Sequence, residues 1–171
     1  MKKLILTFLV IASVGILNAQ TKIAHVNSQT LLDTMPSRKA AIKQITDFQT
    51  EGSKELQEMQ AQIQTLYTEY DAAQKGGESP LMLEMKAKKI QAKEQSYQDR
   101  QNTLEQDLQV IQGRLNEPIL KRVQDAVKIV ADRKKLNYVL DISTTLYASG
   151  EDITSEVAIE LMKLEAAAVK P

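Results

Sequence analysis

Residues 75–80 read Lys-Gly-Gly-Glu-Ser-Pro and stand between two long amphipathic stretches of the chain. Two glycines and a proline so close together are typical of a turn and not of a helix. Ser79 is suited to cap a following helix, with Pro80 at its first position. Two long helices joined by a tight turn must fold back on each other. The sequence therefore predicts an antiparallel helical hairpin with its turn at Gly76, Gly77 and Pro80.

The stretch before the turn begins at Ser37, contains no proline, and repeats apolar residues every seven positions. The expected seam positions are Ile42, Ile45, Gln49, Gly52, Leu56, Met59, Ile63, Leu66, Tyr70 and Ala73. A strict seven-residue seam over about five heptads is typical of a left-handed coiled coil. Gln49 and Gly52 interrupt the seam, and a glycine costs about 1 kcal/mol relative to alanine inside a helix. We predict a weak or bent point at Gly52.

The stretch after the turn carries a seam of its own. Its positions are Leu83, Ala87, Ile90, Glu94, Tyr97, Gln101, Leu104, Leu108, Ile111 and Leu115. Glu94 and Gln101 interrupt this seam and form a second weak stretch. Gln101 lies about as far after the turn as Gly52 lies before it, so the two weak stretches should face each other. Pro118 should bend the second helix, because it lacks a backbone donor and crowds the preceding turn. We expect the hairpin to occupy residues 37–135.

Short segments with alternating apolar residues lie at the two ends of the chain. Residues 22–27, 138–142 and 145–148 read as strands, residues 149–152 as a turn, and a final helix begins at Thr154. The ends must meet to make one sheet, so residues 20–36 and 136–171 should form a small body. The residues expected to build its strands and its self-association surface are Ile23, Val26, Val139, Leu140, Ile142, Leu146 and Tyr147. So small a core is marginal alone, which favours oligomerisation.

The first nineteen residues have the pattern of a secretory signal peptide. Lys2 and Lys3 precede an apolar run of about 14 residues, shorter than the roughly 20 that cross a bilayer. Cleavage is expected after Ala19, with an uncleaved membrane anchor as the alternative. The chain has no cysteine, which excludes disulfides and a lipid-modified cysteine. An exported protein of this kind must hold itself together by packing or by oligomerising.

Composition argues against several classes of function. Without Lys2 and Lys3 the chain carries 20 basic and 22 acidic residues, whereas a nucleic-acid binder usually has a basic excess. His25 is the single histidine and has no clustered ligands beside it. The two glycines of the turn join helices, which is not the context of a phosphate-binding loop. No nucleophile stands near a base. We expect no enzyme, no metal site and no cofactor.

Taken together, these segments resemble the Skp/OmpH family of periplasmic chaperones. The resemblance is carried by residues 23–36, 118–131, 137–143, 146–148 and 152–154. It implies a mainly α chain with a small β body. It further implies a homotrimer with a shared β-barrel body, whose hairpins project as arms around a cavity for unfolded outer-membrane proteins. It implies a periplasmic holding chaperone that uses no ATP. The alternative is a structural or adaptor coiled coil of the cell envelope without general chaperone activity.

Two groups of side chains near the turn are candidate contacts. Met82 and Met85 are adaptable apolar residues suited to varied clients. Lys86, Lys89 and Lys93 fall on one helical face and are candidate contacts for clients, lipopolysaccharide or an anionic membrane. The alternative is that these lysines form an ordinary solvated flank. Members of the resembled family are strongly basic and this chain is slightly acidic, which weakens the expectation of lipid binding.

Overall fold

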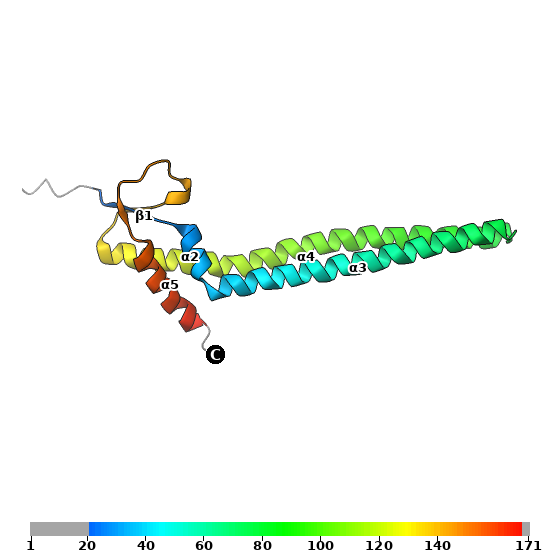
Figure 1. Ribbon diagram of the computed structural model, residues 1–171, viewed down its shortest axis with the longest axis horizontal. Helices are drawn as coiled ribbons and strands as arrows, with labels where there is room; N and C mark the ends of the chain where they lie inside the picture. The colour runs from blue at the N-terminus through cyan, green and yellow to red at the C-terminus, as the bar shows by residue number, and fades with distance from the viewer. Residues whose placement is uncertain (1–20, 169–171) are drawn as a thin grey trace, which may run out of the picture. The chain divides into compact units, whose positions relative to one another are not determined.

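The computed structural model describes residues 21–168, so the predicted signal peptide and its cleavage after Ala19 lie outside the described residues. In chain order the elements are β1 (Ile23–Val26), α2 (Ser28–Thr34), α3 (Pro36–Lys75), α4 (Pro80–Lys134), β2 (Tyr138–Asp141), the short 3-10 helix η1 (Ile142–Thr144), β3 (Glu151–Asp152) and α5 (Thr154–Ala168), as Figure 1 shows. The expectation of a mainly α chain with a long helical hairpin and a few short strands is confirmed.

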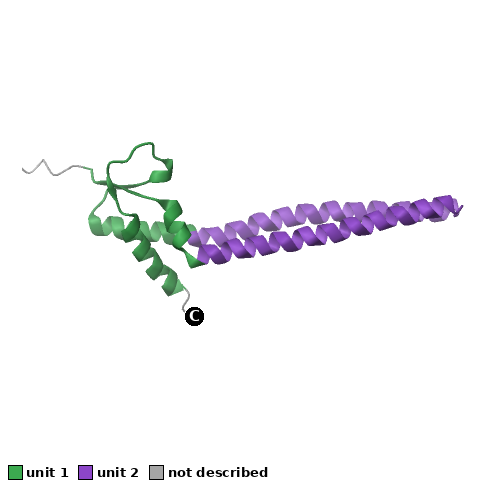
Figure 2. Cartoon of the chain, viewed as in Figure 1, with its two compact units in different colours: residues 1–36, 120–171 green, residues 37–119 purple. Residues whose placement is uncertain are grey.

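The chain divides into two compact units, coloured in Figure 2. Unit 2 covers Ser37–Ile119 and is the helical hairpin. Its turn is closed by Gly77, which has a φ of 73°, and by the amide of Glu78, which donates to the carbonyl of Ala73 at 3.1 Å. Such a left-handed residue after a helix is the conformation that glycine adopts without steric cost. Helix α3 therefore ends at Lys75, and α4 begins at Pro80.

The seam of the hairpin follows the seven-residue pattern closely. Its α3 positions are buried or half-buried except for Ile42 and Gln49, which are exposed. On α4 the exposed seam positions are Ala87, Glu94 and Gln101. Two helices alone cover only one narrow stripe of each other, so most seam residues stay half-buried.

Helix α4 continues through Pro118. The missing amide of this proline leaves the carbonyl four residues earlier, on Arg114, without its usual helical donor. Both helices continue without a break at Gly52 and Pro118. A continuous helix can be straight or bent, so the bends expected at these positions remain predictions.

Unit 1 contains the described residues up to Pro36 and from Leu120 onward. Its sheet has the strand order β2-β1-β3, and β1 is parallel to both neighbours. Helix α5 contacts both α2 and β1. The buried apolar residues of this unit are Ala24, Val26, Leu31, Met35, Ala126, Val130, Ile153, Val157 and Leu161. The first strand thus lies at the centre of a sheet that the chain completes only near its end.

The strand predicted over 145–148 and the turn predicted over 149–152 are wrong. The third strand is Glu151–Asp152, and Ile142 belongs to η1 instead of extending β2. The physical reason lies at Asp141, whose carboxylate accepts a hydrogen bond from the amide of Ser143 and whose carbonyl accepts one from the hydroxyl of Thr145. These bonds turn the chain out of the sheet. The alternating apolar pattern of 145–148 therefore does not mark a strand within this chain.

Candidate functional site

The first turns of α4, directly after the hairpin turn, carry an exposed group of large apolar side chains. Leu81, Met82 and Met85 are exposed, with Leu81 at 67% and Met85 at 56% of their full areas. We call these three residues the tip cluster. Met82 and Met85 had been singled out from the sequence, whereas Leu81 had been missed. Its signal was available, because the second residue of a helix that starts at Pro80 has no preceding turn to cover it.

The three lysines on the flank of the tip differ in their surroundings. Lys86 is half-buried and lies 3.8 Å from a carboxylate oxygen of Glu78. Lys89 and Lys93 form no ion pair within the part of the chain that the structure describes. Exposed pairs of this kind contribute about 0–1 kcal/mol and are screened by salt. The patch thus presents two free ammonium groups and one that is partly neutralised.

Midway along the hairpin, α3 and α4 approach each other at Gly52. A Cβ atom at this glycine would lie 3.1 Å from a methyl carbon of Leu104, so the missing side chain permits the close approach. A groove of about 370 Å³ opens here between the helices, and Gln49 and Gln101 both line it. The prediction that the weak stretches of the two seams face each other is confirmed for Gln101 but not for Glu94. Glu94 lies elsewhere and accepts a hydrogen bond from the hydroxyl of Tyr67 at 2.8 Å.

A bidentate ion pair lies beside this groove. Arg100 on α4 donates to both carboxylate oxygens of Glu55 on α3, at 2.9 and 2.8 Å. These hydrogen bonds lower the pKa of the Glu55 carboxyl. The fork of a guanidinium fixes direction as well as distance, so this pair favours one register of the two helices where the seam is interrupted.

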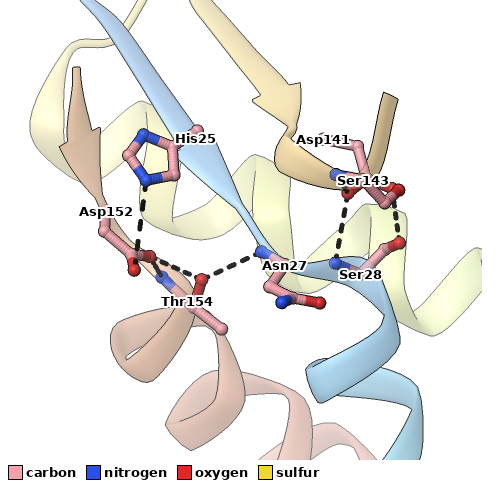
Figure 3. Close-up of polar contacts among 7 residues, drawn as sticks. All are labelled: His25, Asn27, Ser28, Asp141, Ser143, Asp152 and Thr154. Carbon is pink, nitrogen blue, oxygen red and sulfur yellow. Dashed lines mark hydrogen bonds and ion pairs between the residues drawn. The ribbon is translucent and has the colours of Figure 1, made fainter. Parts of the chain in front are cut away.

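A polar cluster lies at the carboxyl ends of the parallel strands in unit 1 (Figure 3). Asp141, which ends β2, accepts hydrogen bonds from the hydroxyl and amide of Ser28. Asp152, which ends β3, accepts from the amide and hydroxyl of Thr154, and that hydroxyl oxygen accepts from the amide of Asn27. Because parallel strands end at one edge, both aspartates reach the start of a helix: α2 for Asp141 and α5 for Asp152.

This cluster has the residue types of a hydrolytic site but not the geometry. The hydroxyls of Ser28 and Thr154 are bonded to aspartates, so neither is held by an imidazole that could take its proton. His25 is 9% exposed; its Nε2 lies 4.0 Å from Asp152, and its Nδ1 is buried without a hydrogen-bond partner. These hydrogen bonds connect the ends of the strands to the starts of the helices, which is a structural role. No group of three metal-ligating side chains occurs among residues 21–168.

The outer surface of unit 1 carries much of the apolar area that was expected to mediate self-association. Leu146 is fully exposed, Tyr147 is 82% exposed, and Ile23, Leu140 and Ile142 are exposed as well. Two residues of that set lie differently: Val26 is buried in the core of unit 1, and Val139 is half-buried. Tyr138, which had not been singled out, is also exposed and lies beside Ile23 in the register of β1 and β2.

Within the described range, none of the helices combines the length and apolar character that crossing a bilayer requires.

Comparison with known proteins gives a consistent result. The family model described as "Outer membrane protein (OmpH-like)" matches residues 22–161. The chain is 30% identical over 142 residues to the "Chaperone protein Skp" of Photorhabdus laumondii, covering 81% of this chain and 84% of that one. It is 29% identical over 154 residues to the protein of the same name in Pectobacterium atrosepticum, covering 87% and 90%. The crystal structure of an OmpH-like protein from Caulobacter crescentus matches with a TM-score of 0.73 at 18% identity, covering 85% and 86% of the two chains.

Proposed function

Because this chain belongs to the family of OmpH-like outer membrane proteins, we propose that it is a periplasmic chaperone that holds unfolded outer-membrane proteins without ATP. The relatives named chaperones align with most of this chain and most of their own length. A holding chaperone binds the unfolded state and competes with aggregation by mass action. It needs accessible, adaptable surface and no reaction centre.

The tip cluster is the observation that carries this proposal. Leu81, Met82 and Met85 remain exposed within five residues of each other on α4. Exposed apolar groups that serve no packing within their own chain are typical of interaction sites. Unbranched methionine side chains adapt to partners of differing shape. Three such residues at the end of a long hairpin can contact apolar segments of an unfolded chain.

The outer surface of unit 1 supports self-association as the second part of the proposal. Leu146 and Tyr147 lie on a segment between η1 and β3, where no core of this chain covers them. Burial of apolar area contributes roughly 25 cal/mol per Å². A homotrimer, as the family resemblance implies, would cover these side chains and enlarge a body that is small on its own.

Export to the periplasm by the signal peptide, cleaved after Ala19, is part of the proposal. Its support is the charged start and short apolar run of residues 1–19. Contact with lipopolysaccharide or an anionic membrane through Lys89 and Lys93 is a weaker component, because Glu78 lies beside the third lysine of the patch.

The proposal is tested by diluting a urea-unfolded outer-membrane β-barrel protein into buffer with and without the mature chain. Suppressed light scattering at about one trimer per client is expected. Replacing Leu81, Met82 and Met85 together by serine should weaken suppression several-fold, because the tip would lose its apolar contacts. A matched triple variant, Gln91→Ser, Gln95→Ser and Gln98→Ser, changes polar residues of α4 and should retain suppression. Aggregation that proceeds unchanged with the unaltered chain would refute the holding function.

A further inference from the structure

The groove midway along the hairpin has an apolar lining beside a free carboxylate. Phe48 and Leu56 line it from α3, and Leu104 and Leu108 from α4. Glu105 also lines it and forms no ion pair or hydrogen bond within the described part of the chain. This arrangement, which we call the arm groove, offers an apolar contact next to an uncompensated negative charge.

The charge of the hairpin is unevenly distributed along its length. The shaft, residues 44–71 and 94–119, holds eleven acidic and three basic side chains, a net charge of −8. Three of these acidic groups are already paired: Glu58 with Lys54, Glu55 with Arg100, and Asp47 with Lys43, which lies just before the shaft. The other eight form no ion pair within the described residues. The tip, residues 72–93, holds five lysines against two glutamates, a net charge of +3. The overall neutrality of the chain thus hides an acidic shaft and a basic tip.

We infer that the arm groove binds segments of unfolded polypeptide in which an apolar side chain is flanked by lysine or arginine. The apolar lining supplies contact area, and the acidic shaft supplies charge complementarity for the flanking cations. This inference rests on the proposed holding function and identifies which parts of a client the shaft takes. An acidic segment would be repelled from the same groove, because like charges in partial contact raise the free energy of the complex.

The groove exists because of the local sequence. Gly52 lets Leu104 pack against the backbone of α3. The neighbouring seam positions are Gln49 and Gln101, whose exposed side chains do not fill the space that two leucines would occupy. The interruption of both seams at one level therefore leaves an open lining where a regular coiled coil would be closed.

Three labelled, unstructured peptides test the inference by fluorescence anisotropy with the full mature chain. The first alternates tryptophan and leucine with lysine, the second replaces lysine by glutamate, and the third keeps lysine but replaces the apolar residues by serine. The first should bind at least about tenfold more tightly than either of the others at low salt. The advantage over the acidic peptide should shrink at about 1 M salt, where the Debye length falls to about 3 Å.

Single substitutions test whether the peptide binds in the arm groove. Glu105→Gln should weaken binding of the lysine-tryptophan peptide about threefold, and Glu105→Lys more strongly, whereas Glu69→Gln removes one shaft charge away from the groove and should change binding little. Phe48→Ala should weaken the same peptide without altering the preference for lysine over glutamate. Circular dichroism checks that each variant keeps its helices.

Several outcomes would overturn the inference. Equal binding of the basic and acidic peptides would show that charge does not select the bound segment. Unchanged peptide binding by Glu105→Lys would show that the peptide does not bind in the arm groove. A change in molecular mass on Glu105→Lys would mean that a second copy of the chain covers the groove. Suppressed aggregation of an outer-membrane protein without peptide discrimination would leave the proposed function intact and refute this inference alone. Discrimination without suppression would refute only the proposed function.

Discussion

Among the glycines that the structure describes, Gly150 has the least room for a side chain. A Cβ atom there would lie 2.7 Å from the carbonyl oxygen of Ile23, which belongs to the central strand of unit 1. Gly150→Ala should lower the free energy of unfolding by about 1–3 kcal/mol, because backbone of two paired segments must separate. Gly113 lies within α4 with nothing near its Cβ position, so Gly113→Ala should raise stability by about 0.5–1 kcal/mol. Urea unfolding followed by circular dichroism compares the two variants, and equal effects would contradict the contact.

Asp141 and Asp152 make the stability of unit 1 dependent on pH. Hydrogen bonds from Ser28 and from Thr154 lower the pKa of the two carboxyls below their ordinary 3.8. In acid the unfolded chain therefore binds more protons than the folded one, and stability falls as pH drops. The contribution is complete above about pH 5 and is lost as pH falls through 3.8 and below.

The measurement is the urea midpoint between pH 7 and pH 3 at a fixed protein concentration. The double variant Asp141→Asn and Asp152→Asn should be less stable at neutral pH and show a flatter pH dependence. A slope in the variant as steep as in the unaltered chain would mean that other carboxyls are responsible.

At the scale of elements, helix α5 packs against the rest of unit 1 through one face only, and its opposite face is exposed. Leu161 is fully buried, whereas Ile159 on the opposite side is 62% exposed. Leu161→Ala should cost about 2–5 kcal/mol of stability, because it removes buried methyl groups and leaves a cavity. Ile159→Ala should change stability by no more than about 0.5 kcal/mol. Thermal unfolding at one protein concentration makes the comparison, and a large cost at Ile159 would show that the assembled protein covers this face.

The hairpin could be predicted in detail because its signals are local. The turn residues and the seven-residue seam each depend on neighbours within a few positions. The third strand could not be predicted from the sequence, because Glu151 and Asp152 are polar and give no alternating apolar signal. These two residues form a strand only because they pair with β1, which is distant in the sequence. The apolar residues of 145–148 did give that signal while lying outside the sheet. The exposed Leu81 and the arm groove likewise follow from how the helices meet, not from any motif.

At the scale of the whole molecule, the apolar outer surface of unit 1 predicts self-association. Leu146→Asp places a charge on a side chain that is fully exposed in the single chain, so folding of unit 1 should be unaffected. An interface, by contrast, would have to bury that charge at a cost of several kcal/mol. Analytical ultracentrifugation should show the unaltered chain as a trimer and the variant shifted to lower mass. Ser149→Asp is a nearby polar control. A monomer in both cases would contradict the assembly.

The position of β1 at the centre of the sheet also has a consequence for the order of folding. Lys22, at the start of the described chain, donates to the side chain of Asn137, which is 115 residues later. The hairpin needs only contacts around its own turn, whereas the sheet must close a loop of 115 residues. Local contacts form sooner than distant ones. If export delivers the N-terminal part of the chain first, the arm can form before either neighbour of β1 has arrived. Oligomers would assemble only from finished chains, because an interrupted product carries an arm without a body.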